Sequence, residues 1–225
     1  MLIYLVRHGE IDTDRQKRFI GQIDLPLTGA GVWQAKMLRE RLAGITPAGV
    51  YCSDLSRSLL TAQIIAGAHT LSPVADIGLR EICLGEWEGR SFADIRQKHP
   101  AEFAKRGANI AEYMPPGGES FSAFSRRIMT AFNRLVSSVN GDLLLVGHAG
   151  VNRVIISQLL GMPIHNIFHI CQGYGCLNII CRNKDGYRLK LLNSLEHIDR
   201  SPRTDTLPAL CRLNISQRGN MVEER

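Results

Sequence analysis

The chain has 225 residues, of which 44% are hydrophobic, and its formal net charge is +6 at pH 7. This length is enough for one sizeable hydrophobic core and excludes a fibrous or disordered chain. The apolar run at the N-terminus, Leu2 to Val6, is too short for a signal peptide or a membrane-spanning helix, so we expect a cytoplasmic protein. The mild excess of base is compatible with several kinds of anionic partner and selects none of them.

Apolar runs and apolar residues at helical spacing alternate along most of the chain. Short apolar runs predict six strands, over residues 2–6, 50–53, 74–79, 142–146, 176–182 and 187–192. Helical spacing predicts four helices, over residues 29–42 after the N-cap Thr28, 55–66, 119–139 and 151–159. Strands that alternate with helices predict an α/β layer architecture with a mostly parallel sheet.

The C-terminal end differs in composition from the rest. Residues 199–225 are polar, contain two prolines and have no clear period. We therefore predict one folded domain over residues 1–198 and a loosely ordered polar extension over residues 199–225.

Six cysteines raise the question of a metal site. Cys171, Cys176 and Cys181 are evenly spaced, but the chain has no C-x2-C pair, and the last two lie in an apolar run typical of a strand. We interpret these cysteines as small buried thiols and expect no metal.

Charged side chains and histidines follow four of the predicted strands. His8 follows Arg7 after the first strand, His148 follows the strand 142–146, and Arg57 and Glu81 come shortly after two others. In open α/β sheets, ligands bind beyond the carboxyl ends of the strands. Arginines bind phosphate oxygens in bidentate geometry, a neutral imidazole is a nucleophile, and a carboxylic acid protonates a leaving alkoxide. This set of side chains predicts phosphoryl transfer.

An ordered series of motifs along roughly residues 1–160 resembles the histidine phosphatase superfamily, also called phosphoglycerate mutase-like. The matching segments are Leu5-Val6-Arg7-His8-Gly9-Glu10, Arg18, Gly21, Asp24, Pro26-Leu27-Thr28, Gly31, Gln34-Ala35, Ser53-Asp54-Leu55-Ser56-Arg57, Leu79-Arg80-Glu81-Ile82, Gly85-x-Trp87-Glu88-Gly89, Pro116-Gly117-Gly118-Glu119-Ser120 and Val146-Gly147-His148. The resemblance implies a three-layer sandwich with helices on both faces of the sheet.

The resemblance also implies a role for each residue. His8 is the expected nucleophile that becomes phosphohistidine, while Arg7, Arg57 and His148 bind the phosphate and stabilise its developing charge. Glu81 is the expected general acid and then the base that activates water. The implied partner is a small phosphate monoester, without nucleic acid, membrane, metal or cofactor. The oligomeric state stays open, a dimer included.

Asp14, Gly21 and Ala149 are the expected substrate-binding positions. Two departures from the family pattern concern this region: Asp14 replaces a frequent asparagine, and Ile20 replaces the threonine that mutases have before this glycine. An ionised Asp14 repels a phosphate dianion, so this side chain either bonds to His148 or an arginine or points away. Ile20 favours a larger or less polar leaving group.

Within the superfamily, the chain is most similar to the α-ribazole phosphatases, enzymes of cobalamin nucleotide-loop assembly. A phosphoglycerate mutase and a broad-specificity histidine phosphatase are the alternatives. A binding module without turnover is disfavoured because all catalytic positions are filled, and a metallohydrolase is disfavoured because the arginines repel a cation.

The segment between Glu81 and His148 favours the phosphatase over the mutase. We interpret its basic residues as a solvated helix face: Arg90, Arg96, Lys98, Lys105, Arg106, Arg126 and Arg127. Trp87, Tyr113 and Met114 are expected to provide an apolar surface for a bulky, nucleoside-like leaving group.

Overall fold

A six-stranded sheet forms the centre of the described part of the chain, which in this computed structural model comprises residues 1–14 and 16–198. The strands are β1 (Leu2–Arg7), β2 (Pro47–Cys52), β3 (Val74–Ala75), β4 (Asp142–Gly147), β5 (Leu177–Asn183) and β6 (Gly186–Ser194). Their order is β3-β2-β4-β1-β5-β6. The first four are parallel, whereas β5 is antiparallel to β1 and to β6. The predicted mostly parallel sheet is confirmed.

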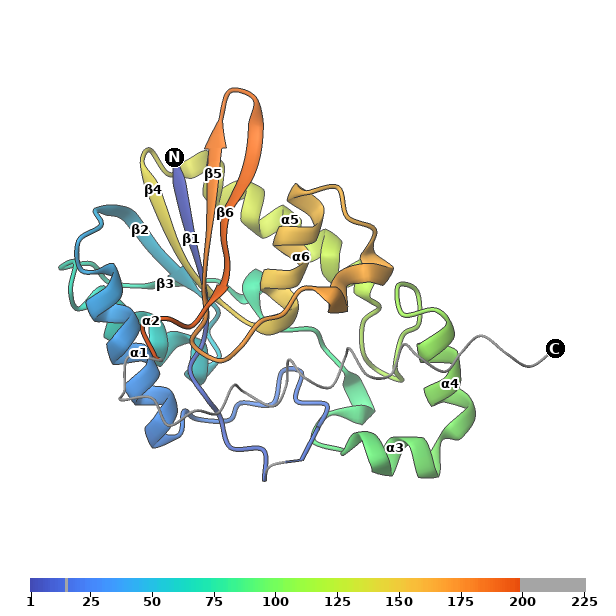
Figure 1. The fold of residues 1–225 in the computed structure, drawn as a ribbon. Coiled ribbons are helices and arrows are strands. Elements are labelled where there is room, and N and C mark those ends of the chain that lie inside the picture. Colours follow the sequence, from blue (N-terminus) through green and yellow to red (C-terminus); the bar gives the residue numbers. More distant parts are fainter. Residues whose placement is uncertain (15, 199–225) are drawn as a thin grey trace.

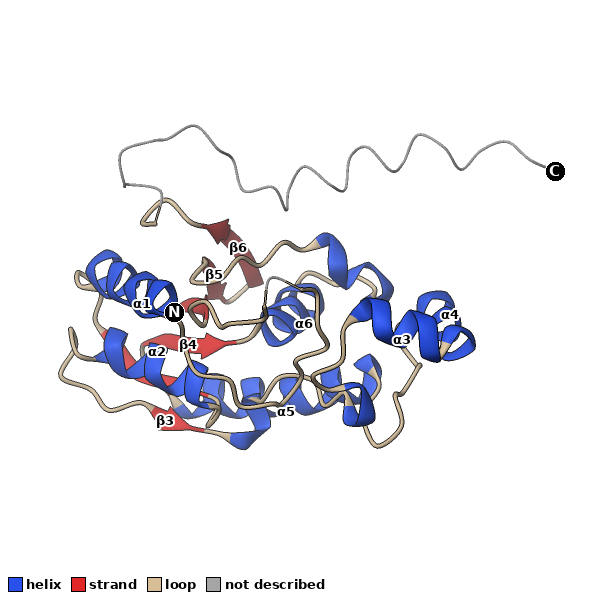
Figure 2. Cartoon of the chain, turned by 90° about the horizontal axis from the view of Figure 1, so that it is seen from below, coloured by secondary structure: helices blue, strands red, loops and turns tan. Residues whose placement is uncertain are grey.

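Four of the described α-helices cover the two faces of this sheet, and two shorter ones lie to one side of it. They are α1 (Gly29–Leu42), α2 (Ser56–Ala66), α3 (Phe92–Lys98), α4 (Pro100–Ala108), α5 (Phe121–Ser138) and α6 (Ala149–Leu159). Helices α1 and α2 lie on one face, and α5 and α6 lie on the other (Figure 1). Helices α3 and α4 lie beside the sandwich in both views (Figures 1 and 2). The three-layer arrangement is thus confirmed, and the predicted extension over residues 199–225 lies outside the described residues.

The hydrophobic core has two parts because the side chains of the central strands point alternately to the two faces of the sheet. Tyr4 and Val6 of β1 pack with α1 and α2, whereas Ile3 and Leu5 pack with α5 and α6. Successive side chains of a strand point to opposite faces, and a parallel strand covered on both sides is apolar throughout. The apolar run at the N-terminus is therefore the centre of the domain.

Side-chain caps explain where several elements begin. Thr28 is the N-cap of α1, and its side chain accepts a hydrogen bond from the backbone N–H of Gly31 at 3.0 Å. The prediction of a strand over residues 74–79 was wrong beyond Ala75. There Asp76 accepts a hydrogen bond from the backbone N–H of Gly78 at 2.8 Å and begins a 3₁₀ helix over Ile77–Leu79. A side chain that caps its own turn competes with the ladder of a strand.

The cysteines are not uniformly buried. Cys176 is buried, Cys181 is half-buried, and Cys171 is exposed in the loop before β5. The prediction of a buried thiol was therefore wrong for Cys171, because the apolar run begins only after that loop. Within residues 1–14 and 16–198, no group of three or more His, Cys, Asp or Glu side chains is placed to hold a metal ion.

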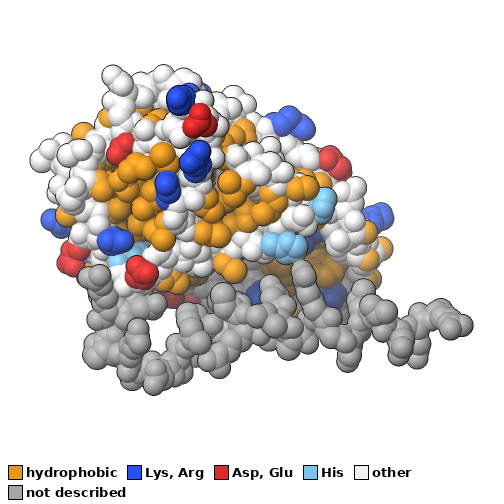
Figure 3. Space-filling view, turned by 45° about the horizontal axis from the view of Figure 1, so that its top comes forward, with side chains coloured by type: hydrophobic (Ala, Val, Ile, Leu, Met, Phe, Trp, Pro, Cys, Tyr) orange, Lys and Arg blue, Asp and Glu red, His pale blue; other side chains and the backbone are white. Residues whose placement is uncertain are grey.

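Part of the surface is apolar. Figure 3 shows hydrophobic side chains gathered on one face, between scattered charged ones. Leu160, Phe168 and Leu192 are among the large apolar side chains that are exposed. Among the described helices, none is both long and apolar enough to cross a membrane.

Candidate active site

A cavity of about 210 Å³ opens at the carboxyl ends of β1 and β4. Its ionisable wall contains residues from both strand ends, from the loops and from the helices: Arg7, His8, Arg18, Arg57, Glu81, Arg106 and Arg153. Its apolar wall includes Ile11, Phe19, Ile20, Ile82, Leu84, Phe92, Phe121 and Phe168. The cavity therefore offers positive charge beside a large apolar surface, a combination that suits an anion attached to an organic group.

His8 is held in one tautomer. Its backbone N–H donates to the carbonyl of Gly147 at 3.1 Å, which ties the residue to the end of β4. Its Nδ1 lies 2.7 Å from the carbonyl oxygen of Gly9. A carbonyl only accepts, so Nδ1 bears the proton and Nε2 keeps its lone pair. Burial above all, and then Arg7 and Arg57, hold the pKa of His8 well below its usual value. The ring is therefore neutral, with the lone pair of Nε2 available.

His148 packs against the ring of His8. The two ring centroids are 5.1 Å apart, and Nε2 of His148 lies 2.7 Å from Oγ of Ser53. Burial, followed by His8 and Arg57, lowers the pKa of His148 well below its usual value. His148 is fully buried and is not among the residues of the cavity wall. His148 therefore packs against His8 from outside the cavity wall, and its contact with phosphate stays a prediction.

The two predicted phosphate-binding arginines are fastened by backbone carbonyls. Arg7 donates from Nη1 to Gln172 at 2.6 Å, and its guanidinium carbon lies 3.7 Å from the ring centroid of Tyr174. Arg57 donates to the carbonyls of Ile23 at 2.6 Å and Gly21 at 2.8 Å. The Nε atoms of both arginines are buried and have no partner among the described residues. Both arginines line the cavity, and their guanidinium groups are oriented before any ligand binds.

The Glu81 side chain can lie at the cavity because the second residue of α6 is a glycine, Gly150. One carboxyl oxygen of Glu81 accepts from the backbone N–H of Gly150 at 2.9 Å, and the other accepts from that of Ile82 at 3.0 Å. A Cβ atom at Gly150 would lie 2.2 Å from the Glu81 carboxyl group. Only glycine at this position allows the contact, which places the candidate general acid at the N-terminus of the helix that follows His148.

The three predicted substrate-binding positions differ in their placement. Gly21 and Ala149 line the cavity, and Gly21 adopts φ +53 with its carbonyl bound to Arg57. Asp14 is exposed, does not line the cavity, and forms an ion pair with Arg18 at 3.2 Å. Bonding of Asp14 to an arginine is one of the alternatives expected from the sequence, and the structure shows it. Arg18, and not Asp14, lines the cavity.

Sequence reasoning missed several residues of the wall. Arg153 donates from Nε to the carbonyl of Ile170 at 2.8 Å and lies over the ring of Phe168, and Tyr174 lies 5.6 Å from the ring of His8. Arg153 could have been found, because it lies five residues after His148 on a predicted helix. Tyr174 is in a loop with no local signal.

Two interpretations of the segment after Glu81 need correction. Arg106 was assigned to a solvated face, but it lines the cavity over the ring of Phe19, and burial lowers its pKa. Trp87 was assigned to a leaving-group surface, but it is buried in the core against Phe19 and Tyr113. Short helices have no long periodic face, so their inward side is hard to assign from sequence.

Comparison with known proteins agrees with this geometry. A family model described as "Histidine phosphatase superfamily (branch 1)" matches residues 3–195. The chain is 31% identical to the adenosylcobalamin/alpha-ribazole phosphatase of Escherichia coli over 195 residues, which cover 86% of this chain and 96% of the relative. It is 35% identical over 165 residues to a Yersinia pestis protein named "Probable phosphoglycerate mutase GpmB", covering 72% of this chain and 76% of that protein.

A solved structure gives the same result. The crystal structure of the alpha-ribazole phosphatase from Shigella flexneri superposes with a TM-score of 0.80 at 31% identity. The match covers 86% of this chain and 96% of that chain.

Proposed function

The chain belongs to the histidine phosphatase superfamily and is a phosphatase, and on that premise we propose that it cleaves phosphate monoesters through a phosphohistidine on His8. The observation that carries this proposal is the tautomer of His8. Its Nδ1 proton is used by the carbonyl of Gly9, so Nε2 keeps a lone pair beside two arginines on the cavity wall.

The proposed reaction has two steps. In the first, Nε2 of His8 attacks phosphorus, the bond from phosphorus to the ester oxygen breaks, and protonated Glu81 donates its proton to the leaving alkoxide. In the second, Glu81 accepts a proton from water, the resulting hydroxide attacks phosphorus, and the bond between nitrogen and phosphorus breaks. Inorganic phosphate leaves, and both side chains return to their first state.

Arg7 and Arg57 would stabilise the phosphoryl oxygens in both steps. Their guanidinium groups are oriented by backbone carbonyls before any ligand binds, so little reorganisation is needed when charge develops. Burial foremost, and then the same two charges, lower the pKa of His8 and keep it neutral. One pair of cations thus serves both binding and activation.

The leaving group that fits best is bulky and partly aromatic. Phe19, Phe92 and Phe168 line the cavity together with the apolar Ile20. Stacking on such rings favours a flat heterocycle. We therefore propose α-ribazole phosphate, or an ester of similar shape, as the substrate, and a place in cobalamin nucleotide-loop assembly. The relatives from Escherichia coli and Shigella flexneri bear that name.

A phosphoglycerate mutase is the second candidate. Arg106 and Arg153 provide positive charge beyond Arg7 and Arg57, as a small, highly charged intermediate would require. The apolar wall favours the phosphatase, because it would leave much of such an intermediate without polar contacts.

One preparation can test both functions. Phosphate release should be measured from α-ribazole phosphate and a panel of other monoesters, and exchange between 3- and 2-phosphoglycerate should be measured with a bisphosphate primer. We expect hydrolysis of α-ribazole phosphate to be the fastest reaction. Mutase turnover above the hydrolysis of every ester would reverse the order of the two candidates.

A further inference from the structure

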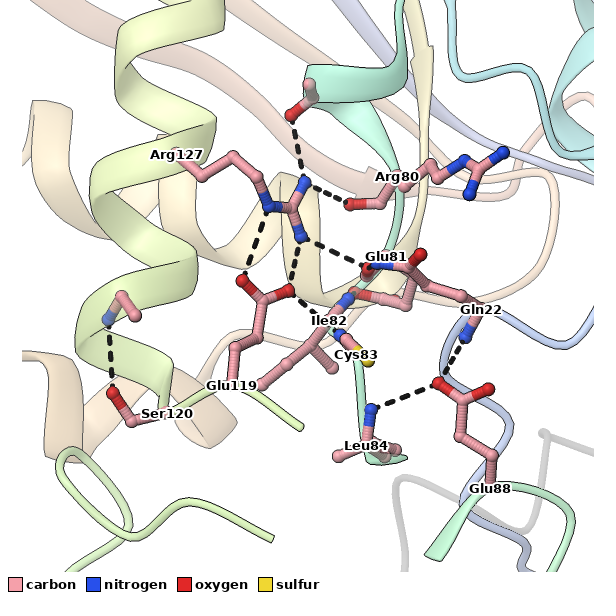
Figure 4. A network of polar contacts seen from close by, with 12 residues as sticks. Gln22, Arg80, Glu81, Ile82, Cys83, Leu84, Glu88, Glu119, Ser120 and Arg127 are labelled. Carbon is pink, nitrogen blue, oxygen red and sulfur yellow. Dashed lines mark hydrogen bonds and ion pairs between the residues drawn. The ribbon is translucent and has the colours of Figure 1, made fainter. Parts of the chain in front are cut away.

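Arg127 of α5 uses its guanidinium on the backbone that bears Glu81. Its Nη1 donates to the carbonyls of Gly78 and Arg80, each at 3.0 Å, and its Nη2 donates to the carbonyl of Glu81 at 3.3 Å (Figure 4). These three contacts, all within residues 78–81, therefore hold the chain where it approaches the cavity. This is an unusual use of a charged side chain, since a solvated helix face would leave it in water.

Glu119 binds both Arg127 and the backbone on the other side of Glu81. Its carboxylate forms an ion pair with Arg127 at 2.5 Å and accepts from the backbone N–H of Cys83 at 2.9 Å. Its own N–H donates to the carbonyl of Cys83, also at 2.9 Å. The pair of side chains thus fastens the backbone on both sides of Glu81 (Figure 4).

The backbone around Glu81 depends on these side-chain contacts because it has no regular secondary structure. Residues 80–84 form neither helix nor strand, so no ladder of backbone hydrogen bonds fixes them. The carboxyl group of Glu81 itself is held by two backbone N–H groups, those of Gly150 and Ile82. The position of the Glu81 carboxyl group in the cavity therefore depends on the position of the backbone at residues 80–84.

We propose that Arg127, paired with Glu119, is a positioning residue that sets the distance between the Glu81 carboxyl group and the ester oxygen; this inference rests on the proposed function. Proton transfer requires a heavy-atom distance of about 2.6–3.2 Å. A displacement of about 1 Å can cost about 10²-fold in rate. The guanidinium group suits this task because its N–H donors have fixed directions in one plane, whereas a lysine ammonium is a point charge on a flexible stem.

The test compares two leaving groups in the full-length protein. An alkyl phosphate needs a proton on its leaving oxygen, whereas dinitrophenyl phosphate does not. Arg127→Gln should lower kcat/KM, which reports formation of the phosphohistidine, by about 10²-fold for the alkyl ester and by less than about 3-fold for dinitrophenyl phosphate. Arg127→Lys should restore only part of the loss. Arg126→Gln, which alters the exposed neighbouring residue, is the matched control and should leave both rates unchanged.

Other outcomes separate the inference from the function on which it rests. Equal losses for both esters, or no loss for either, would overturn the positioning role of Arg127. If Arg127→Gln does not fold, Glu119→Gln decides, because its amide oxygen still accepts from Cys83 while the charge is gone. That variant should show the same preference for dinitrophenyl phosphate, and an unchanged ratio would overturn the inference. Absence of phosphohistidine in the wild-type protein would instead contradict the proposed function.

Discussion

The two ends of the cavity are built in different ways. At the end that we propose to bind phosphate, Arg7 is the last residue of β1, His8 follows it, and Arg57 is buried and bound to two backbone carbonyls. At the leaving-group end, Arg106 and Phe92 come from the short helices α3 and α4, beside the sandwich. The sheet gives the reacting groups a rigid frame, while the added helices can change without disturbing it. We therefore expect that substitutions can change chemistry and specificity separately in this molecule.

The largest effect is expected at the phosphate end. His8→Ala removes the attacking nitrogen and should lower turnover of every ester on the order of 10³-fold or more. Brief incubation of the wild-type protein with substrate should leave an acid-labile, base-stable phosphate on the chain that the variant lacks. His165→Ala, at an exposed position, is the control. Full turnover by His8→Ala would end the proposal.

Glu81 is proposed to act on the bond between the phosphate and the leaving group, so the loss of activity caused by its substitution should depend on the leaving group. Glu81→Gln keeps the shape but removes the proton donor and should lower hydrolysis of alkyl esters by about 10²–10⁴-fold. The loss should be smaller for nitrophenyl phosphate, because nitrophenolate leaves without a proton. Rates for both esters can be compared with those of Glu40→Gln, which alters an exposed residue of α1. Equal losses of kcat/KM, which reports only formation of the phosphohistidine, would show that Glu81 does not protonate the leaving group.

The buried imidazoles should make the phosphate end sensitive to acid. Burial foremost lowers the pKa of both His8 and His148 in the folded protein. The unfolded chain takes up a proton on each ring near pH 6.5, so folding stability is complete above about pH 6.5 and is lost as the pH falls toward the lowered values. Each ring should contribute a slope of about 1.4 kcal/mol per pH unit.

Denaturant unfolding between about pH 7 and pH 5 measures this slope. His8→Asn should remove the contribution of one ring and flatten the dependence of the unfolding free energy on pH. A slope that is the same in wild type and variant would show that His8 is not held neutral by the fold.

The smallest effect is expected at the leaving-group end. Arg106→Gln should raise KM about 10-fold for esters whose leaving group bears a second negative charge, since a charge-assisted hydrogen bond contributes about 1.5–3 kcal/mol. It should leave kcat for nitrophenyl phosphate unchanged, because Arg106 is not among the groups that hold the reacting phosphate. Lys105→Gln, on the exposed side of the same helix, is the control. A fall in kcat for all esters would contradict the separation of the two ends.

The sequence by itself determined the parts of this protein that depend on local pattern. The apolar runs of β1 and β4 located the sheet, and His8 and His148 were placed at one edge because each directly follows a parallel strand. Thr28 identified the start of α1, and the apolar stripe of α5 identified its buried face. These signals are local, since a cap or a period is complete within a few turns.

Only the tertiary structure decided which side chains of the loops and short helices reach the cavity. Arg106 turned inward while Trp87 entered the core, and Tyr174 came beside His8 from a loop that is distant in sequence. The contact of Glu81 with Gly150 joins residues 69 positions apart. Such contacts depend on how whole elements pack, and a short segment has no periodic face from which its inward side can be inferred.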